Sequence, residues 1–175
     1  MSTPTAKMMV LVGEKFACVK VAGRANFSSA VDFKTVIAGL EQKGYPYIVV
    51  ELSDCPLMDS TFLGVLAASG LRRLPPAGDC ETKAIEIRNA NERLLELLEN
   101  LGVLHLFKTC NGALPECKEV AAAPCESSRE TLTEASLEAH KTLMALDPKN
   151  VDRFKDVTKF LAEDLARIKS VPPGK

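Results

Sequence analysis

The chain has 175 residues, of which 46% are hydrophobic and 26% are charged, and its formal net charge is −1. This composition is ordinary for a globular protein, and the length allows one domain with a hydrophobic core plus an appendage. With no net positive charge, no tryptophan and two tyrosines, the chain lacks the basic surface and the stacking side chains that are typical of nucleic-acid-binding proteins.

The first part of the chain predicts strands followed by a helix. Residues 8–22 contain two β-rich runs around a glycine, which predict a hairpin. Apolar residues at helical spacing then predict a helix that is capped by Ser28 or Ser29 and ends at Gly44. The nearly continuous apolar run 47–52 is typical of a strand that is covered on both faces.

The same alternation continues downstream. A helix is predicted from 60 to about 74, where two prolines follow, and residues 82–89 alternate like a strand. Another helix is expected with Asn89 or Asn91 as its cap, followed by a short strand over 103–108. This order of elements predicts an α/β fold, a mixed β-sheet with helices packed on it.

The last third of the chain predicts an appendage. Residues 109–130 contain prolines, a glycine and three cysteines without a clear period, which indicates a linker between a domain at 8–108 and a C-terminal helical extension at 131–170. The extension consists of two amphipathic segments, the second beginning at Pro148. Their apolar faces must be buried on the domain, on each other, or on a second chain as a homodimer.

Three polar residues, Asp59, Ser60 and Thr61, separate the strand from the helix in the stretch LSDCPLMDSTFLGVLAAS. Asp59 stands where an N-cap accepts hydrogen bonds from the first helical amides. Ser60 falls in the first turn, near the positive end of the helix dipole. A phosphate there would add about −1.5 to −2 charges and act on a docking partner more than on the fold. A simple helix cap also accounts for the cluster.

Other chemistry is not predicted. The N-terminal apolar run is too short for a signal peptide, and no run approaches the ~18 apolar residues of a membrane span, so we expect a cytoplasmic protein without a membrane partner. No cysteine pair has C-x-x-C spacing, and no phosphate-binding loop or catalytic grouping is found, so neither a metal, a cofactor nor an enzyme is expected. A metal or redox role stays open only for Cys110, Cys117 and Cys125.

The stretch MDSTFLGVLAA, with the strand YIVVELS before it and the turn GRANFSSA upstream, resembles the signature of the STAS domain family. This family includes bacterial anti-sigma factor antagonists. The resemblance covers about residues 8–108 and implies a STAS-like sheet with helices packed on it. Asp59 matches the aspartate of the family motif, and Leu63 and Gly64 match its Leu-Gly pair. The resemblance implies that these residues cap the helix or support the site.

The resemblance also implies a partner and a switch. Ser60, or as a second choice Thr61, would be phosphorylated by an anti-sigma factor that is a serine kinase of the histidine-kinase-like ATPase class. The dephosphorylated antagonist would bind that kinase, free the sigma factor and so control transcription. The surface expected to bind the partner comprises Asn26, Phe27, Ser28, Ser29, Met58 and Phe62.

One residue departs from the family pattern. Phe62 stands where the family commonly has glycine, so its ring would alter the approach of a kinase or form part of the docking surface. The alternative interpretation is a STAS scaffold or sensor module, in which Ser60 is only a cap and the C-terminal helices dimerise or bind partners.

Overall fold

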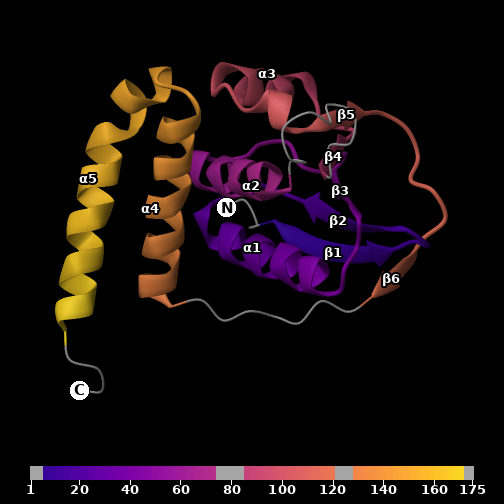
Figure 1. Cartoon of the computed structure of the whole chain (residues 1–175), viewed down its shortest axis with the longest axis horizontal. Helices are drawn as coiled ribbons and strands as arrows, with labels where there is room; N and C mark the ends of the chain where they lie inside the picture. The colour runs from indigo at the N-terminus through magenta and orange to yellow at the C-terminus, as the bar shows by residue number, and fades with distance from the viewer. Residues whose placement is uncertain (1–5, 74–84, 121–127, 172–175) are drawn as a thin grey trace.

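The structure is a computed structural model, and it describes residues 6–73, 85–120 and 128–171. Within these residues six strands form one sheet, and of the five α-helices the last lies outside the fourth, away from the sheet (Figure 1). The strands are β1 (Lys7–Val12), β2 (Phe16–Ala22), β3 (Tyr47–Glu51), β4 (Ile85–Arg88), β5 (Lys108–Cys110) and β6 (Lys118–Val120). The helices are α1 (Phe27–Gln42), α2 (Ser60–Arg72), α3 (Glu92–Asn100), α4 (Arg129–Leu146) and α5 (Lys149–Ser170).

The sheet is mixed, with the strand order β5-β4-β3-β2-β1-β6. Strands β2 to β5 run parallel in that order, whereas β1 pairs antiparallel with both β2 and β6. The parallel pairs need crossover connections, and α1 and α2 supply them between β2 and β3 and between β3 and β4. The predicted α/β architecture, a mixed sheet with helices packed on it, is therefore confirmed.

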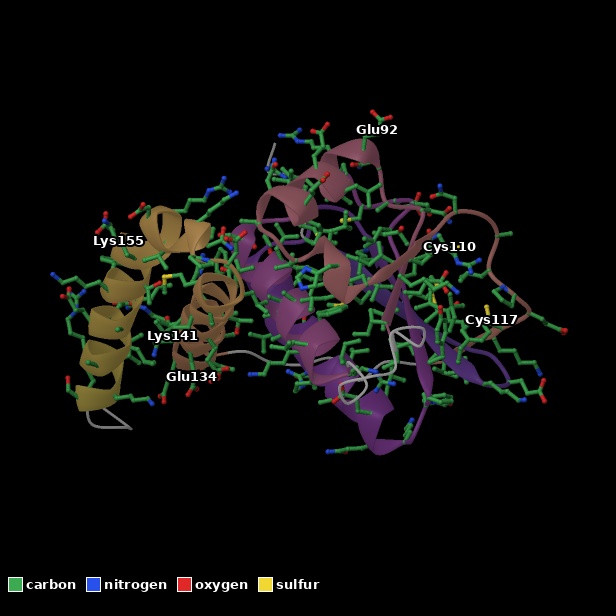
Figure 2. All side chains as sticks on the ribbon, turned by 45° about the horizontal axis from the view of Figure 1, so that its top comes forward. Glu92, Cys110, Cys117, Glu134, Lys141 and Lys155 are labelled. Atoms are coloured by element: carbon green, nitrogen blue, oxygen red, sulfur yellow. The ribbon has the colours of Figure 1, made fainter. Side chains whose placement is uncertain are left out.

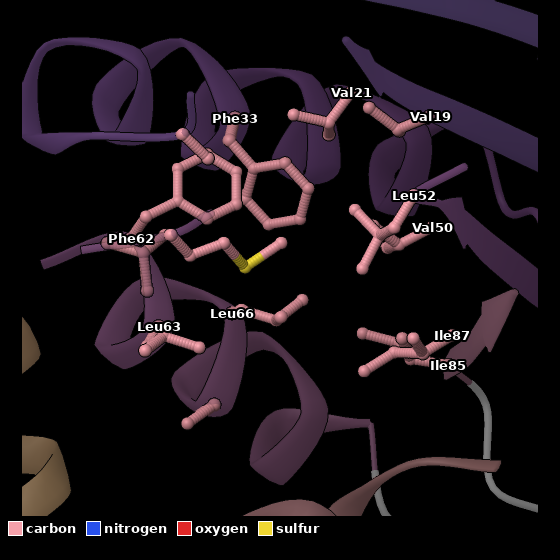
Figure 3. Packing of buried hydrophobic residues seen from close by; sticks show 14 of the residues in the cluster. Val19, Val21, Phe33, Val50, Leu52, Phe62, Leu63, Leu66, Ile85 and Ile87 are labelled. Atoms are coloured by element: carbon pink, nitrogen blue, oxygen red, sulfur yellow. The ribbon is translucent and has the colours of Figure 1, made fainter. Parts of the chain in front are cut away.

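The hydrophobic core lies between the sheet and the pair α1 and α2 (Figure 3). Alternate residues of the parallel strands point toward the helices, because side chains of a strand alternate between its two faces. From the helices, the rings of Phe33 and Phe62 meet with their centroids 4.9 Å apart, and both side chains are fully buried. The residues of the strands facing them include Val19, Val21, Val50, Ile85 and Ile87, and Leu52 joins them directly after β3.

Helices α4 and α5 form an antiparallel hairpin at one end of the molecule (Figure 1). Helix α4 packs on α2 and α1, and α5 packs on the outer side of α4. The turn between them is anchored by Asn150, whose buried amide donates to the carbonyls of Leu101 at 2.8 Å and Leu143 at 2.9 Å. The C-terminal extension thus buries part of its apolar surface on the same chain.

Two sequence-based expectations about strands differ from the structure. The strand predicted over 103–108 begins only at Lys108 and continues to Cys110 as β5, because Leu104–Leu106 make a 3₁₀ turn that brings the consecutive residues Leu106 and Phe107 into the core. Strand β6 lies inside the segment predicted to be irregular. Its residues are exposed and pair only with the edge of β1, so it shows no apolar alternation.

The helix caps also refine the prediction. Helix α1 is capped by Asn26, and not by Ser28 or Ser29, because the Asn26 side chain accepts from the backbone amides of both serines. The Ser29 hydroxyl accepts from the Asn26 amide in return, which completes a capping box. Of the two asparagines proposed for α3, Asn91 is the cap.

The cysteines that the structure describes are all free thiols: Cys18, Cys55, Cys110 and Cys117. Cys110 and Cys117 lie at the end of the molecule opposite α5 (Figure 2), whereas Cys125, for which a role was left open, lies outside the described residues. The described residues contain no group of three or more potential metal ligands. None of their helices is both long enough and apolar enough to cross a bilayer.

The sheet face away from α1 and α2 buries a carboxylate. Glu86 is 3% exposed and accepts hydrogen bonds from Arg88 Nε at 2.7 Å and from the Tyr47 hydroxyl. Arg88 also donates to the Ala113 carbonyl at 2.7 Å, which ties the segment before β6 to the sheet. Burial raises the pKa of Glu86, but the hydrogen bonds from Arg88 and Tyr47 outweigh it, so the pKa lies below its ordinary value.

We expect Arg88→Met to leave the Glu86 carboxylate buried without a cation and to lower the free energy of unfolding at pH 7 by about 3 kcal/mol. Because a lowered folded-state pKa contributes stability that is lost as pH falls, the wild type should lose more stability than the variant on acidification. Urea unfolding at pH 7 and at a pH below the unperturbed Glu pKa of about 4.3, toward the lowered folded-state pKa, measures both effects. Arg93→Met on the exposed face of α3 is the control, and an equal deficit at both pH values would contradict the expectation.

Candidate functional site

The loops before α1 and α2 are joined side by side. Ala25 donates its amide to the Leu57 carbonyl at 3.0 Å, and the Asp59 amide donates to the Ala25 carbonyl at 2.9 Å, with a parallel bridge between Ala25 and Met58. Because β2 and β3 are parallel, both strands end at the same edge of the sheet, and both helices begin there. The N-termini of α1 and α2 are therefore neighbours.

Asp59 links these two helix starts. Its Oδ1 accepts from the Phe62 amide at 2.9 Å, which makes Asp59 the N-cap of α2. Its Oδ2 accepts from the Phe27 amide of α1 at 2.7 Å. One carboxylate thus satisfies a first-turn amide of each helix and compensates the positive ends of both helix dipoles.

Ser60 is the first residue of α2 and is half-buried. Its Oγ lies 2.8 Å from Nε2 of His140 on α4, and Nδ1 of the same ring lies 2.6 Å from the Ser136 carbonyl. Because a carbonyl only accepts, Nδ1 donates to Ser136, and Nε2 shares the second hydrogen bond of the ring with the Ser60 hydroxyl. The His140 side chain is 4% exposed, so α4 covers this hydroxyl from one side.

The next residues of α2 contact the same helix. The Thr61 hydroxyl lies 2.8 Å from the Ser136 hydroxyl, and Thr61 is 4% exposed. At Gly64, one turn beyond Ser60, a Cβ atom would lie 2.5 Å from the Ala139 carbonyl oxygen. The two helices are therefore in direct backbone contact, which only a residue without a side chain allows at this position.

The residues expected to bind a partner divide into two groups. Asn26 and Ser28 are half-buried and Phe27 is 51% exposed, so these residues lie at the surface beside Asp59. The others are buried, with exposed fractions of 1% for Ser29, 4% for Met58 and 0% for Phe62. The expectation that these three side chains form a docking surface is therefore wrong.

Phe62 is buried because it points from α2 toward the sheet and packs on Phe33, as Figure 3 shows. Leu63, at 2% exposed, also belongs to the core. The bulky Phe62 thus contributes to packing, whereas Ser60 and Gly64 occupy the helix face that α4 contacts.

A hollow of about 370 Å³ opens next to Thr61 and separates the start of α1 from the helical hairpin. Phe27 and Asp59 line one side of it, and Arg129, Leu132 and Leu161 line the other. Arg129 is paired with Asp164 at 3.0 Å. The exposed part of the candidate site therefore has both an apolar wall and an acidic group.

Sequence reasoning missed the residues of α4 that complete the site. No role was predicted for His140, whereas the structure brings it to a residue 80 positions earlier in the chain. The available signal was weak: Ser136 and His140 are four residues apart, and so lie on one face of α4 together with Ala139. Nothing in that spacing identifies α2 as the surface they contact.

Comparison with known proteins shows a likeness in fold. A crystal structure of an anti-sigma factor antagonist from Mycobacterium paratuberculosis is 17% identical in sequence, with a TM-score of 0.51, and the match covers 60% of this chain and 85% of that chain. No protein-family model and no curated protein matches the sequence. The chain therefore shares its fold with a protein described as an anti-sigma factor antagonist.

We expect Gly64→Ala to lower the free energy of unfolding by about 1–3 kcal/mol, because the new methyl group meets the Ala139 backbone, which cannot rotate away. The matched control is Gly39→Ala in α1, where nothing lies within 4 Å of the added Cβ and stability should rise by roughly 0.5–1 kcal/mol. Urea denaturation measures both. A midpoint that rises in Gly64→Ala as well would show that α2 and α4 are not in close contact.

Proposed function

We propose that this chain is an anti-sigma factor antagonist that is switched by phosphorylation of Ser60. Its partner is an anti-sigma factor that is a serine kinase of the histidine-kinase-like ATPase class, and binding of that kinase frees a sigma factor for transcription. The observation that carries the proposal is the placement of Ser60 as the first residue of α2, beside the Asp59 cap, in a fold similar to that of an antagonist.

Ser60 is favoured over Thr61 as the phosphoacceptor because of exposure. Ser60 is half-buried, whereas Thr61 is 4% exposed and is hydrogen-bonded to Ser136. In the transfer, Ser60 Oγ forms a bond to the γ-phosphorus of ATP while the bond from that phosphorus to ADP breaks. A base of the kinase takes the hydroxyl proton.

The switch would act on binding through charge. A phosphate on Ser60 adds about −1.5 to −2 charges next to the Asp59 carboxylate, on the rim formed by Asn26, Phe27 and Ser28. Acidic groups of a partner that docks on this rim are then repelled. Apolar groups of the partner would have to desolvate the phosphate, which also weakens binding. Only the dephosphorylated chain would therefore bind the kinase, which is partner switching.

We expect the full-length chain to gain one phosphoryl group when it is incubated with ATP and a cognate kinase, and Ser60→Ala to gain none. Each purified serine kinase of the proposed class from the same genome is tested in turn, and intact-protein mass spectrometry counts the phosphoryl groups. Thr61→Ala is the matched control and should still be modified. Equal modification of Ser60→Ala would assign the phosphate elsewhere, and no modification by any of these kinases would contradict the proposed function.

A second candidate function is favoured by the outer surface of α5. Val151 and Val157 are each 42% exposed and Phe160 is 60% exposed, so this helix presents apolar side chains to solvent. Such a surface suits a scaffold that binds a second copy of the chain through its C-terminal helices. Ser60 would then serve only as part of the start of α2.

For this second candidate we expect the full chain to elute as a dimer in size-exclusion chromatography with light scattering. The double variant Val157→Lys, Phe160→Lys should elute as a monomer, because two buried charges would oppose the interface. Lys159→Ala, on an exposed position of the same helix, should leave the dimer intact. A monomeric wild-type chain would exclude this candidate.

A further inference from the structure

Helix α4 occupies the same face of α2 that carries the proposed phosphoacceptor. Ser60, Thr61 and Gly64 each contact α4, through His140, Ser136 and Ala139 respectively. The first two contacts are hydrogen bonds of 2.8 Å between side chains that are wholly or partly buried. The C-terminal hairpin therefore covers the site, although the proposed function needs a kinase to reach it.

The contact leaves no room for a phosphoryl group. Ser60 Oγ is already at hydrogen-bond distance from Nε2 of His140, so a phosphorus atom with its oxygens cannot be inserted between them. The backbones of α2 and α4 touch one turn away at Gly64, so α4 cannot move aside locally. If the phosphorylated side chain instead rotates toward solvent, the buried His140 Nε2 loses its partner, which also weakens the docking of α4.

Electrostatics does not compensate for this loss. The Phe62 amide at the start of α2 already donates to Asp59, whose carboxylate would repel a neighbouring phosphate. Lys34 and Arg129 line the hollows on the two sides of the contact, but they pair with Glu138 at 3.1 Å and Asp164 at 3.0 Å. Lys141 and Arg72 line the same hollow as Lys34, which lies beside Gly64. Ser60 does not line this hollow.

We propose that phosphorylation of Ser60 and docking of α4 on α2 exclude each other, so that a phosphoryl group on Ser60 releases the α4–α5 hairpin from the domain. The inference rests on the proposed function for the phosphorylation itself. The coupling is reciprocal, because two events that exclude each other oppose each other equally in free energy. The docked hairpin therefore protects the Ser60 hydroxyl, and it is an intramolecular competitor of any partner that uses this face of α2.

The test uses the full-length chain with phosphoserine installed at position 60 during translation, so no kinase is required. Hydrogen–deuterium exchange followed by mass spectrometry should show amides of α4 exchanging about tenfold faster or more than in the unmodified chain, while amides of β2, β3 and β4 keep their rates. An unchanged exchange rate in α4 overturns the inference.

The matched control carries phosphoserine at position 28, in the first turn of α1. The Ser28 hydroxyl bonds to Asn26 at 2.7 Å and makes no hydrogen bond to α4 in the described structure, so α4 should keep its protection. An equal acceleration in this control would show a general effect of charge and would overturn the inference. If the amides of the sheet also exchange faster in the chain with phosphoserine at position 60, the Ser60→Asp variant is measured instead. Faster exchange in α4 is expected for this variant, and an unchanged rate would overturn the inference.

Combining the Ala139→Leu substitution with phosphoserine at position 60 tests whether the phosphate acts through the contact between α2 and α4. Ala139→Leu should displace α4 by collision with Gly64, and adding phosphoserine at position 60 should then change α4 exchange no further. Fully additive accelerations would show that the phosphate acts elsewhere, and would overturn the inference. Failure of every kinase to modify Ser60 would defeat the proposed function and leave these exchange results unaffected, so the two failures are distinguishable.

Discussion

The carboxylate of Asp59 accepts one hydrogen bond from the first turn of α1 and one from the first turn of α2. This shared acceptor sets the two helix starts side by side, at the edge where the parallel strands β2 and β3 end. Ser60 consequently stands at the beginning of a helix and close to the surface loop at Asn26. The position of the Ser60 hydroxyl therefore follows from the hydrogen bonds that Asp59 accepts from the helix amides. These bonds stabilise the helix starts whether or not the hydroxyl is modified.

The same helix start meets a second constraint, the close approach of α4. Gly64 allows the backbones to touch, and the hydroxyls of Ser60 and Thr61 find partners on His140 and Ser136. A face of α2 that can hold one helix in this way can hold only one occupant at a time. Under the proposed function, α4, a phosphoryl group and a partner would compete for that face, on which α4 is held by two side-chain hydrogen bonds and one tight backbone contact.

Local patterns predicted much of the fold. The apolar run at β3 and the helical spacing in α1 and α2 identified their elements, because burial against a neighbouring layer imposes a period on the sequence. The strand expected over 103–108 begins only at Lys108, since the short apolar run before it is buried around a 3₁₀ turn. Phe62 was taken as a surface residue because its motif position was considered without knowledge of which face of α2 meets the sheet.

The sequence by itself determined the order of elements from β1 to α3, the Asp59 cap and the place of Ser60 at the start of α2, because each depends on residues within one or two helical turns. Only the tertiary structure decided that α4 covers α2 and that His140 meets Ser60. That contact joins segments 80 positions apart, and its geometry follows from how two helices pack through Gly64 and Ala139. Amphipathic spacing shows that a helix face must be buried, but the surface that buries it is selected by packing in three dimensions.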